Sequence, residues 1–69
     1  MTLKELREGR AYTQAEVAAY CGVTAAAVSM WESGKYTPGL TQLRKLAEFF
    51  KMTIPDMREV IKNSGGIPD

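Results

Sequence analysis

The chain has 69 residues, of which 45% are hydrophobic and 25% are charged, and its net charge at pH 7 is +1. This length fits one domain, and the composition is that of a globular protein rather than a disordered one. One cysteine and no histidine exclude an internal disulfide, histidine-based acid–base catalysis and histidine-ligated zinc. No apolar run is long enough to span a bilayer, so we expect a cytoplasmic protein, with neither a metal nor a cofactor.

Two threonines predict where the first two helices begin. Thr2 and Thr13 each precede a glutamate by three residues, which is the spacing of a capping box. We therefore expect one helix from residue 3 to residue 9 or 10 and a second helix over residues 14–21.

A glycine corner separates the second helix from a third. Gly22 stands where a left-handed C-cap is needed, and only Val23 lies between it and Thr24, the cap of the next helix. So short a connection forces the two helices to cross sharply. The third helix is expected over residues 25–33, ending at Gly34.

The two faces of the helix over residues 25–33 differ in character. Val28 and Trp31 share one face, which we expect to be buried, so that Trp31 is a core residue rather than a stacking platform for a ligand. The opposite face is small and uncharged, and it carries Ala26, Ser29, Met30 and Ser33.

Two further amphipathic helices follow a loop that contains Pro38 and Gly39. Apolar residues repeat at helical spacing over residues 40–50, and again after Thr53. We expect the domain to span residues 1–63, and residues 64–69 to form a frayed C-terminal tail. The predicted fold class is all-α, a compact bundle of four to five helices.

These residues resemble the lambda repressor-like (Cro/repressor, XRE-type) helix-turn-helix family over nearly the whole chain. The matching residues are Arg7, Thr13, Gln14, Val17, Ala18, Gly22, Val23, Thr24, Val28, Ser29, Trp31, Glu32, Gly34, Pro38, Leu43, Leu46, Ala47, Phe50 and Met57. The resemblance implies a domain that binds double-stranded DNA, with residues 25–33 in the major groove and residues 14–21 across it.

The resemblance also implies contacts with DNA phosphates. Gln14 matches a family glutamine that binds a phosphate, and the free N–H groups at a helix start favour an anion on physical grounds as well. The other expected phosphate contacts are Thr24, Lys35, Tyr36, Thr37 and Arg10. For the loop over residues 35–37 and for Arg10, the alternative is simple solvation. Arg7 and Glu32 match a structural ion pair that joins the first helix to the end of the third.

The expected base contacts are Ala25, Ala26, Ser29 and Met30. These side chains cannot make the bidentate pairs that arginine forms with guanine or glutamine with adenine. They leave apolar contact with thymine methyl groups and one hydroxyl. Either specificity rests on thymine contacts and DNA shape, or this surface binds a partner protein.

We therefore expect a transcriptional regulator of bacterial or phage origin that acts as a repressor and is not an enzyme. It would bind a palindromic operator on the nucleoid as a homodimer. We expect no small-molecule effector. The expected dimer interface consists of Phe49, Met52, Pro55 and Ile61. The alternative is that these residues only pack against the last helix. The rival function is a protein-binding helix-turn-helix module, such as an antitoxin or an adaptor, which the near-neutral charge favours.

Overall fold

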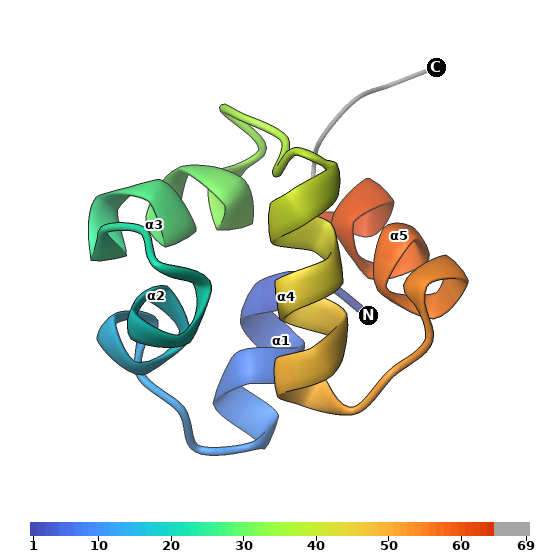
Figure 1. Ribbon diagram of the computed structural model, residues 1–69, viewed down its shortest axis with the longest axis horizontal. Coiled ribbons are helices and arrows are strands. Elements are labelled where there is room, and N and C mark those ends of the chain that lie inside the picture. Colours follow the sequence, from blue (N-terminus) through green and yellow to red (C-terminus); the bar gives the residue numbers. More distant parts are fainter. Residues whose placement is uncertain (65–69) are drawn as a thin grey trace.

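The computed structural model describes residues 1–64, which form five α-helices and no strand. In chain order the helices are α1 (Leu3–Gly9), α2 (Gln14–Cys21), α3 (Ala25–Ser33), α4 (Leu40–Phe50) and α5 (Ile54–Asn63). Figure 1 shows α2 and α3 on one side of the molecule and α5 on the other, with α4 between them and α1 behind α4. None of the five helices is both long and apolar enough to cross a membrane. The predicted all-α fold is confirmed.

The helix starts follow from local hydrogen bonds. Four of the five described helices begin after a threonine whose hydroxyl oxygen accepts a backbone N–H of the first turn: Thr2, Thr13, Thr24 and Thr53. At Thr2 and Thr13, the following glutamate also accepts the N–H of the threonine, at 2.9 and 2.7 Å. The two predicted capping boxes are therefore present, and each threonine cap stabilises its helix by about 1 kcal/mol.

Two glycines end the helices on either side of the corner. Gly22 has φ = +73° after α2, and Gly34 has φ = +80° after α3. A side chain at either position would be strained in this left-handed conformation. After Gly22, the N–H of Val23 donates to the Ala18 carbonyl at 3.0 Å, which closes the end of α2 and turns the chain into α3. Figure 1 shows the two helices running in different directions.

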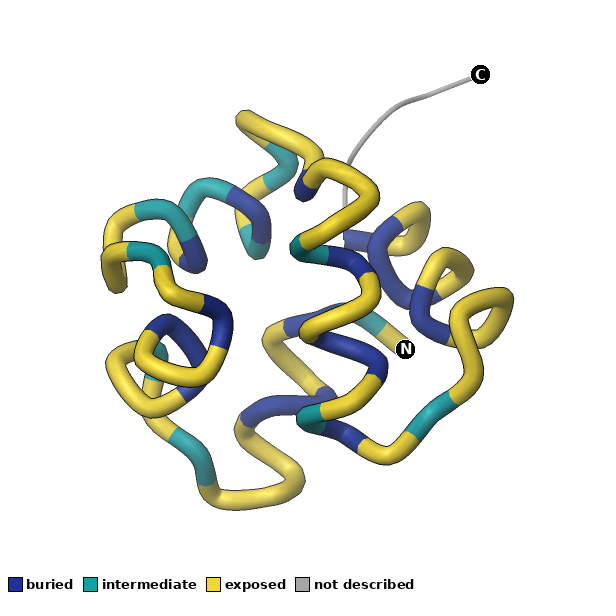
Figure 2. The backbone as a smooth tube through the Cα atoms, viewed as in Figure 1, coloured by how far each residue is buried: buried dark blue, intermediate teal, exposed yellow. Residues whose placement is uncertain are grey.

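The core lies between the inward faces of all five helices, as the buried segments in Figure 2 show. Its members are Leu3, Leu6, Val17, Ala18, Cys21, Val28, Trp31, Leu43, Leu46, Ala47, Phe50, Met57, Val60 and Ile61. Val28 is 0% and Trp31 is 6% exposed, so the predicted buried face of α3 is confirmed. Because these two side chains anchor α3, its opposite face is directed outward.

Ser64 corrects the expected start of the tail. Its side chain is buried, because the hydroxyl oxygen accepts the N–H of Leu3 at 2.8 Å and the hydroxyl donates to the Val60 carbonyl at 2.8 Å. The hydroxyl thus satisfies a first-turn N–H of α1, which has no partner within its own helix. The end of α5 is thereby tied to the start of α1. The rest of the predicted tail, residues 65–69, lies outside the described residues.

Candidate nucleic-acid interface

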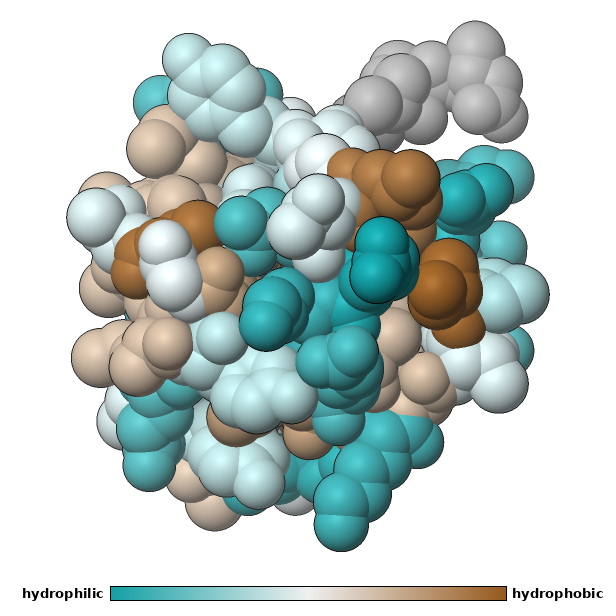
Figure 3. Space-filling view, viewed as in Figure 1, coloured by the Kyte–Doolittle hydropathy of each residue, from teal (hydrophilic) through white to brown (hydrophobic). Residues whose placement is uncertain are grey.

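The outward face of α3 carries the residues that are predicted to contact bases. Ala25, Ala26 and Ser29 are exposed, and Met30 is half-buried. In Figure 3, pale brown and near-white side chains are frequent on the side of the molecule formed by α2 and α3, with a few strongly hydrophobic or hydrophilic ones among them. Glu32, the one charged residue within α3, has a side chain that is only 5% exposed. The outward face of α3 is therefore uncharged as well as small.

Glu32 is turned inward because Arg7 holds it. The Arg7 Nε donates to Glu32 Oε2 at 2.5 Å, and Nη2 donates to Glu32 Oε1 at 3.2 Å. A third donor, Nη1, reaches the Tyr12 carbonyl at 2.9 Å. The hydrogen bond to Glu32 raises the pKa of Arg7 above its ordinary value, although burial acts in the opposite direction. The expected partners are thus in contact, and they join α1 to the last turn of α3 as a buried, bidentate ion pair.

Gln14, the predicted phosphate contact, belongs to the same network. Its Nε2 donates to Glu32 Oε1 at 3.0 Å, a bond that the sequence did not reveal. A carboxamide nitrogen carries two N–H donors, so Glu32 holds one N–H, and the second has no hydrogen-bond partner among residues 1–64 and can bind an anion. The anchoring bond fixes the direction in which the second N–H points.

A polar hollow of about 250 Å³ opens beside this network, where α1, α2 and α3 meet. Its lining residues are Lys4, Gln14, Ser29, Glu32 and Ser33. Arg7 compensates the charge of Glu32, and among the described residues that line the hollow Lys4 is the cation. Sequence reasoning missed Lys4, although it precedes Arg7 by three residues and therefore shares its helix face.

The loop after α3 is tied to the end of that helix. The N–H groups of Lys35 and Tyr36 donate to the Met30 carbonyl at 3.0 and 3.3 Å. Their side chains and that of Thr37 are exposed, and Tyr36 is 62% exposed. Lys35 and Tyr36 thus follow α3 after its C-cap, Gly34. At the other end of α3, the exposed Thr24 is occupied as an N-cap, since its Oγ1 accepts the Ala27 N–H at 3.1 Å.

Arg10, the remaining predicted phosphate contact, is used elsewhere. Its Nη1 donates to the Phe50 carbonyl at 3.1 Å, and its guanidinium lies 5.9 Å from the centre of the Phe50 ring. A cation at a helix C-terminus offsets the negative end of the helix dipole. Arg10 therefore caps α4, and we leave it out of the proposed interface.

The residues predicted as a dimer interface do not form one exposed apolar patch. Phe49 and Met52 are half-buried and pack against the core, and Ile61 is 8% exposed, which leaves only Pro55 fully at the surface. The centre of the Phe49 ring lies 4.6 Å from that of Tyr12, which precedes α2, and 5.2 Å from that of Tyr20 on α2. Phe49 is partly covered by aromatic residues that are distant in sequence, and the expected dimer interface stays a prediction.

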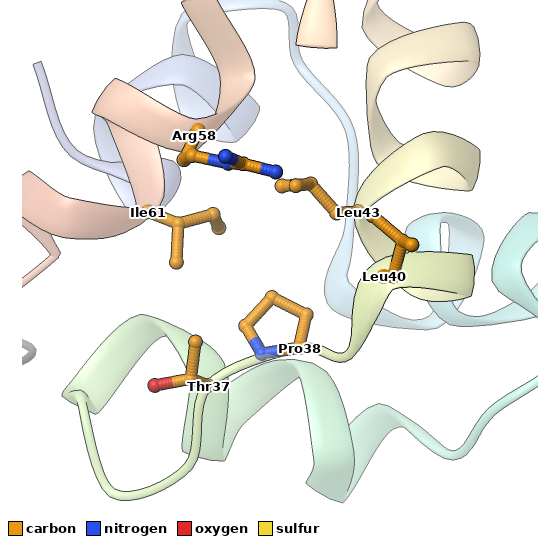
Figure 4. A pocket seen from close by; sticks show the side chains of 6 residues that line it. All are labelled: Thr37, Pro38, Leu40, Leu43, Arg58 and Ile61. Atoms are coloured by element: carbon orange, nitrogen blue, oxygen red, sulfur yellow. The ribbon is translucent and has the colours of Figure 1, made fainter. Parts of the chain in front are cut away.

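A different apolar surface lies where α4 begins beside α5. This surface is a groove with a volume of about 320 Å³, and its lining residues, drawn in Figure 4, are Thr37, Pro38, Leu40, Leu43, Arg58 and Ile61. Leu40 is 63% exposed at the edge of this groove. Figure 3 shows strongly hydrophobic side chains gathered over the same region. Of the predicted interface residues, only Ile61 belongs to this surface.

Comparison with known proteins accounts for this architecture. A helix-turn-helix family model matches residues 3–57. The chain belongs to the lambda repressor-like helix-turn-helix family. Over 55 residues it is 38% identical to the HTH-type transcriptional activator BcrR of Enterococcus faecalis, an alignment that covers 80% of this chain and 27% of that protein. The chain thus spans about a quarter of the length of this relative. No solved structure matches it significantly.

Within this helix-turn-helix domain, α2 and α3 are the two helices of the motif. The corner over residues 22–24 is the turn between them. The family is one of DNA-binding transcription regulators. The second helix of such a motif is the one that enters the major groove, and here that helix is α3.

Proposed function

We propose that this domain binds double-stranded operator DNA as the reading module of a transcriptional regulator, with α3 in the major groove. The observation that carries the proposal is the combination of an outward, uncharged face of α3 with an anchored amide and a lysine at its side. Small side chains let a helix approach the base edges in the major groove. Hydrogen-bond donors beside the helix can then bind the phosphate oxygens of the DNA backbone.

Contacts with phosphates supply the affinity in this proposal. Gln14 offers its second N–H at the start of α2, where the helix dipole also favours an anion, and Lys4 lies in the same hollow. Lys35 and Tyr36 follow α3 and offer a second group of donors. With few cations available, we expect a moderate salt dependence, with a slope of about −0.9 per phosphate neutralised.

Contacts with bases supply the specificity. Ala25, Ala26 and Met30 offer apolar contact to thymine methyl groups, and Ser29 offers one hydroxyl. Each methyl group removed from water is worth about 0.8 kcal/mol. Specificity therefore comes from several small contacts, together with the shape of the DNA.

A selection from random duplexes tests this function. The full chain is mixed with a library of random double-stranded DNA, and the bound fraction is sequenced over several rounds. We expect an enriched, thymine-containing motif whose affinity falls moderately as the salt concentration rises. No enrichment, combined with binding that salt does not change, would contradict the proposal and favour the rival protein-binding module.

We further propose that two copies bind a palindromic operator. One reading helix makes a small interface, and a two-fold dimer doubles it. The groove beside Leu40 supports this, because covering it with a second copy would bury an apolar residue that is 63% exposed. An inverted repeat in the selected motif, with half-sites about one helical turn apart, is the expected result. A single, unrepeated half-site would contradict it.

Repression by occupancy is the regulatory outcome that we propose. A domain bound to its operator excludes other proteins from the same stretch of DNA, and it needs no contact with those proteins to do so. The relative from Enterococcus faecalis is named as an activator, so the sign of regulation needs its own test. A reporter gene with the selected site overlapping its promoter should lose expression when the protein is present, and a gain would identify an activator.

A further inference from the structure

We infer that the α3 face recognises the C5-methyl group of a pyrimidine rather than thymine as such. The protein therefore accepts 5-methylcytosine at positions of the DNA site where it binds thymine. This inference rests on the proposed DNA-binding function and names the feature of the DNA that is read. It makes the domain sensitive to cytosine methylation.

The chemistry of the major groove makes the two bases equivalent for an apolar reader. Thymine presents a methyl group at C5 and an acceptor, O4, beside it. 5-Methylcytosine presents the same methyl group at the same position, but the neighbouring group is the N4 amine, a donor. Only a side chain that donates without accepting, or accepts without donating, separates these two bases.

Among the described residues on the outer face of α3, none is a strong donor-only or acceptor-only side chain, because the Met30 thioether accepts only weakly. Ala25 and Ala26 present only methyl groups in the exposed first turn, and Met30 adds a thioether. The Ser29 hydroxyl both donates and accepts, so it suits O4 of thymine and N4 of 5-methylcytosine equally well.

The one carboxylate that would favour cytosine is withdrawn from this face. A glutamate accepts from the N4 amine of cytosine, but the Glu32 side chain is 5% exposed and is bound by Arg7 and by Gln14. The same network occupies one donor of Gln14. Glu32 and one donor of Gln14 are therefore bound within the protein, while Lys4 and the second Gln14 N–H are assigned to phosphates, so that the methyl contacts decide between bases.

The expected binding order follows from one methyl group. Duplexes with thymine or with 5-methylcytosine at a contacted position should bind the protein with equal affinity. Duplexes with cytosine there, or with uracil in place of thymine, should bind about fourfold more weakly for each methyl group lost. Methylation of a cytosine in the site therefore strengthens binding.

Two parallel selections test this inference. One random duplex library is synthesised with deoxycytidine and the other with 5-methyldeoxycytidine, and the full chain selects from both. We expect positions that require thymine in the first library to accept thymine or 5-methylcytosine in the second. If those positions require thymine in both libraries, the inference is overturned while the proposed function stands. If neither library yields a motif, the proposed function fails and the inference fails with it.

A charge variant provides the matched comparison. Ala26→Lys adds a donor without an acceptor to the α3 face, so it should favour thymine over 5-methylcytosine, whereas Asn63→Lys adds the same charge on α5 and should leave their ratio near one. The ratio is measured by fluorescence anisotropy on duplexes that differ only at the selected position. Circular dichroism checks that both variants fold. A wild-type protein that binds 5-methylcytosine as weakly as cytosine overturns the inference.

Discussion

The amide of Gln14 at the start of α2 donates to the carboxylate of Glu32 in the last turn of α3, with 3.0 Å between Nε2 and Oε1. Because Arg7 holds the same carboxylate from α1, three helices meet at one buried ion pair. The phosphate-binding amide and the reading helix are thus fixed to each other.

The two carboxylates that approach Arg7 should differ greatly in their effect on stability. Glu32→Gln leaves the buried guanidinium without its counter-charge and should lower the free energy of unfolding by about 3–5 kcal/mol. Glu8→Gln is the matched control, because Glu8 lies 3.8 Å from Arg7 with a side chain that is 57% exposed, and its loss should cost about 0–1 kcal/mol. Urea denaturation measures both, and equal effects would contradict the assigned role of the buried pair.

Replacement of Gln14 by alanine should weaken binding to all DNA sequences by the same factor. A hydrogen bond to a charged phosphate contributes about 1.5 kcal/mol, so we expect roughly a tenfold loss of affinity. The enriched motif itself should not change, because phosphate contacts carry no sequence information. Anisotropy titrations with the selected duplex and with an unrelated duplex provide the measurement. An unaltered affinity would remove Gln14 from the interface.

Lys4→Met should reduce the salt dependence of DNA binding. If the lysine neutralises one phosphate from its hollow, the slope of log affinity against log salt becomes shallower by about 0.9. Lys62→Met on α5 removes the same charge from a helix away from α3 and should leave the slope unchanged. Identical slopes for the two variants would show that Lys4 acts only through the net charge.

Leu40→Ser should abolish dimer formation without unfolding the domain, because Leu40 is 63% exposed at the edge of the apolar groove. Ile54→Ser is the matched control, since Ile54 is an exposed apolar residue outside the groove lining. Sedimentation velocity of both variants and of the wild type measures the association. A wild type that stays monomeric at all concentrations, on DNA and off it, would contradict the proposed dimer.

Cys21 should make the domain less stable in alkaline solution. Burial raises the pKa of the Cys21 thiol above its ordinary value of 9.0, so the folded state favours the neutral form. The resulting stability is fully present below pH about 9 and is lost as the pH rises above the unfolded value. Cys21→Ala should lower stability at neutral pH but remove this part of the alkaline loss. Denaturation curves at pH 7 and at pH 10 for both proteins test the sign.

The bounds of the helices and the family were accessible from sequence alone. Thr2, Thr13 and Thr24 each bond to a backbone group three residues away, and Gly22 adopts a conformation that side chains disfavour. These signals depend only on residues a few positions apart, so they can be recognised in the sequence before the fold is known. The spacing of Val28 and Trp31 predicted the buried face of α3 for the same reason.

Contacts between residues distant in sequence were decided only by the tertiary structure. Arg10 reaches the Phe50 carbonyl, Ser64 bonds to Leu3, and Lys4 joins the hollow beside Gln14. Each depends on which helix ends meet in space, and the periodicity of one helix does not carry this information. Local hydrogen bonds thus determine where each helix begins and ends, whereas packing determines which of its polar groups remain free to bind DNA.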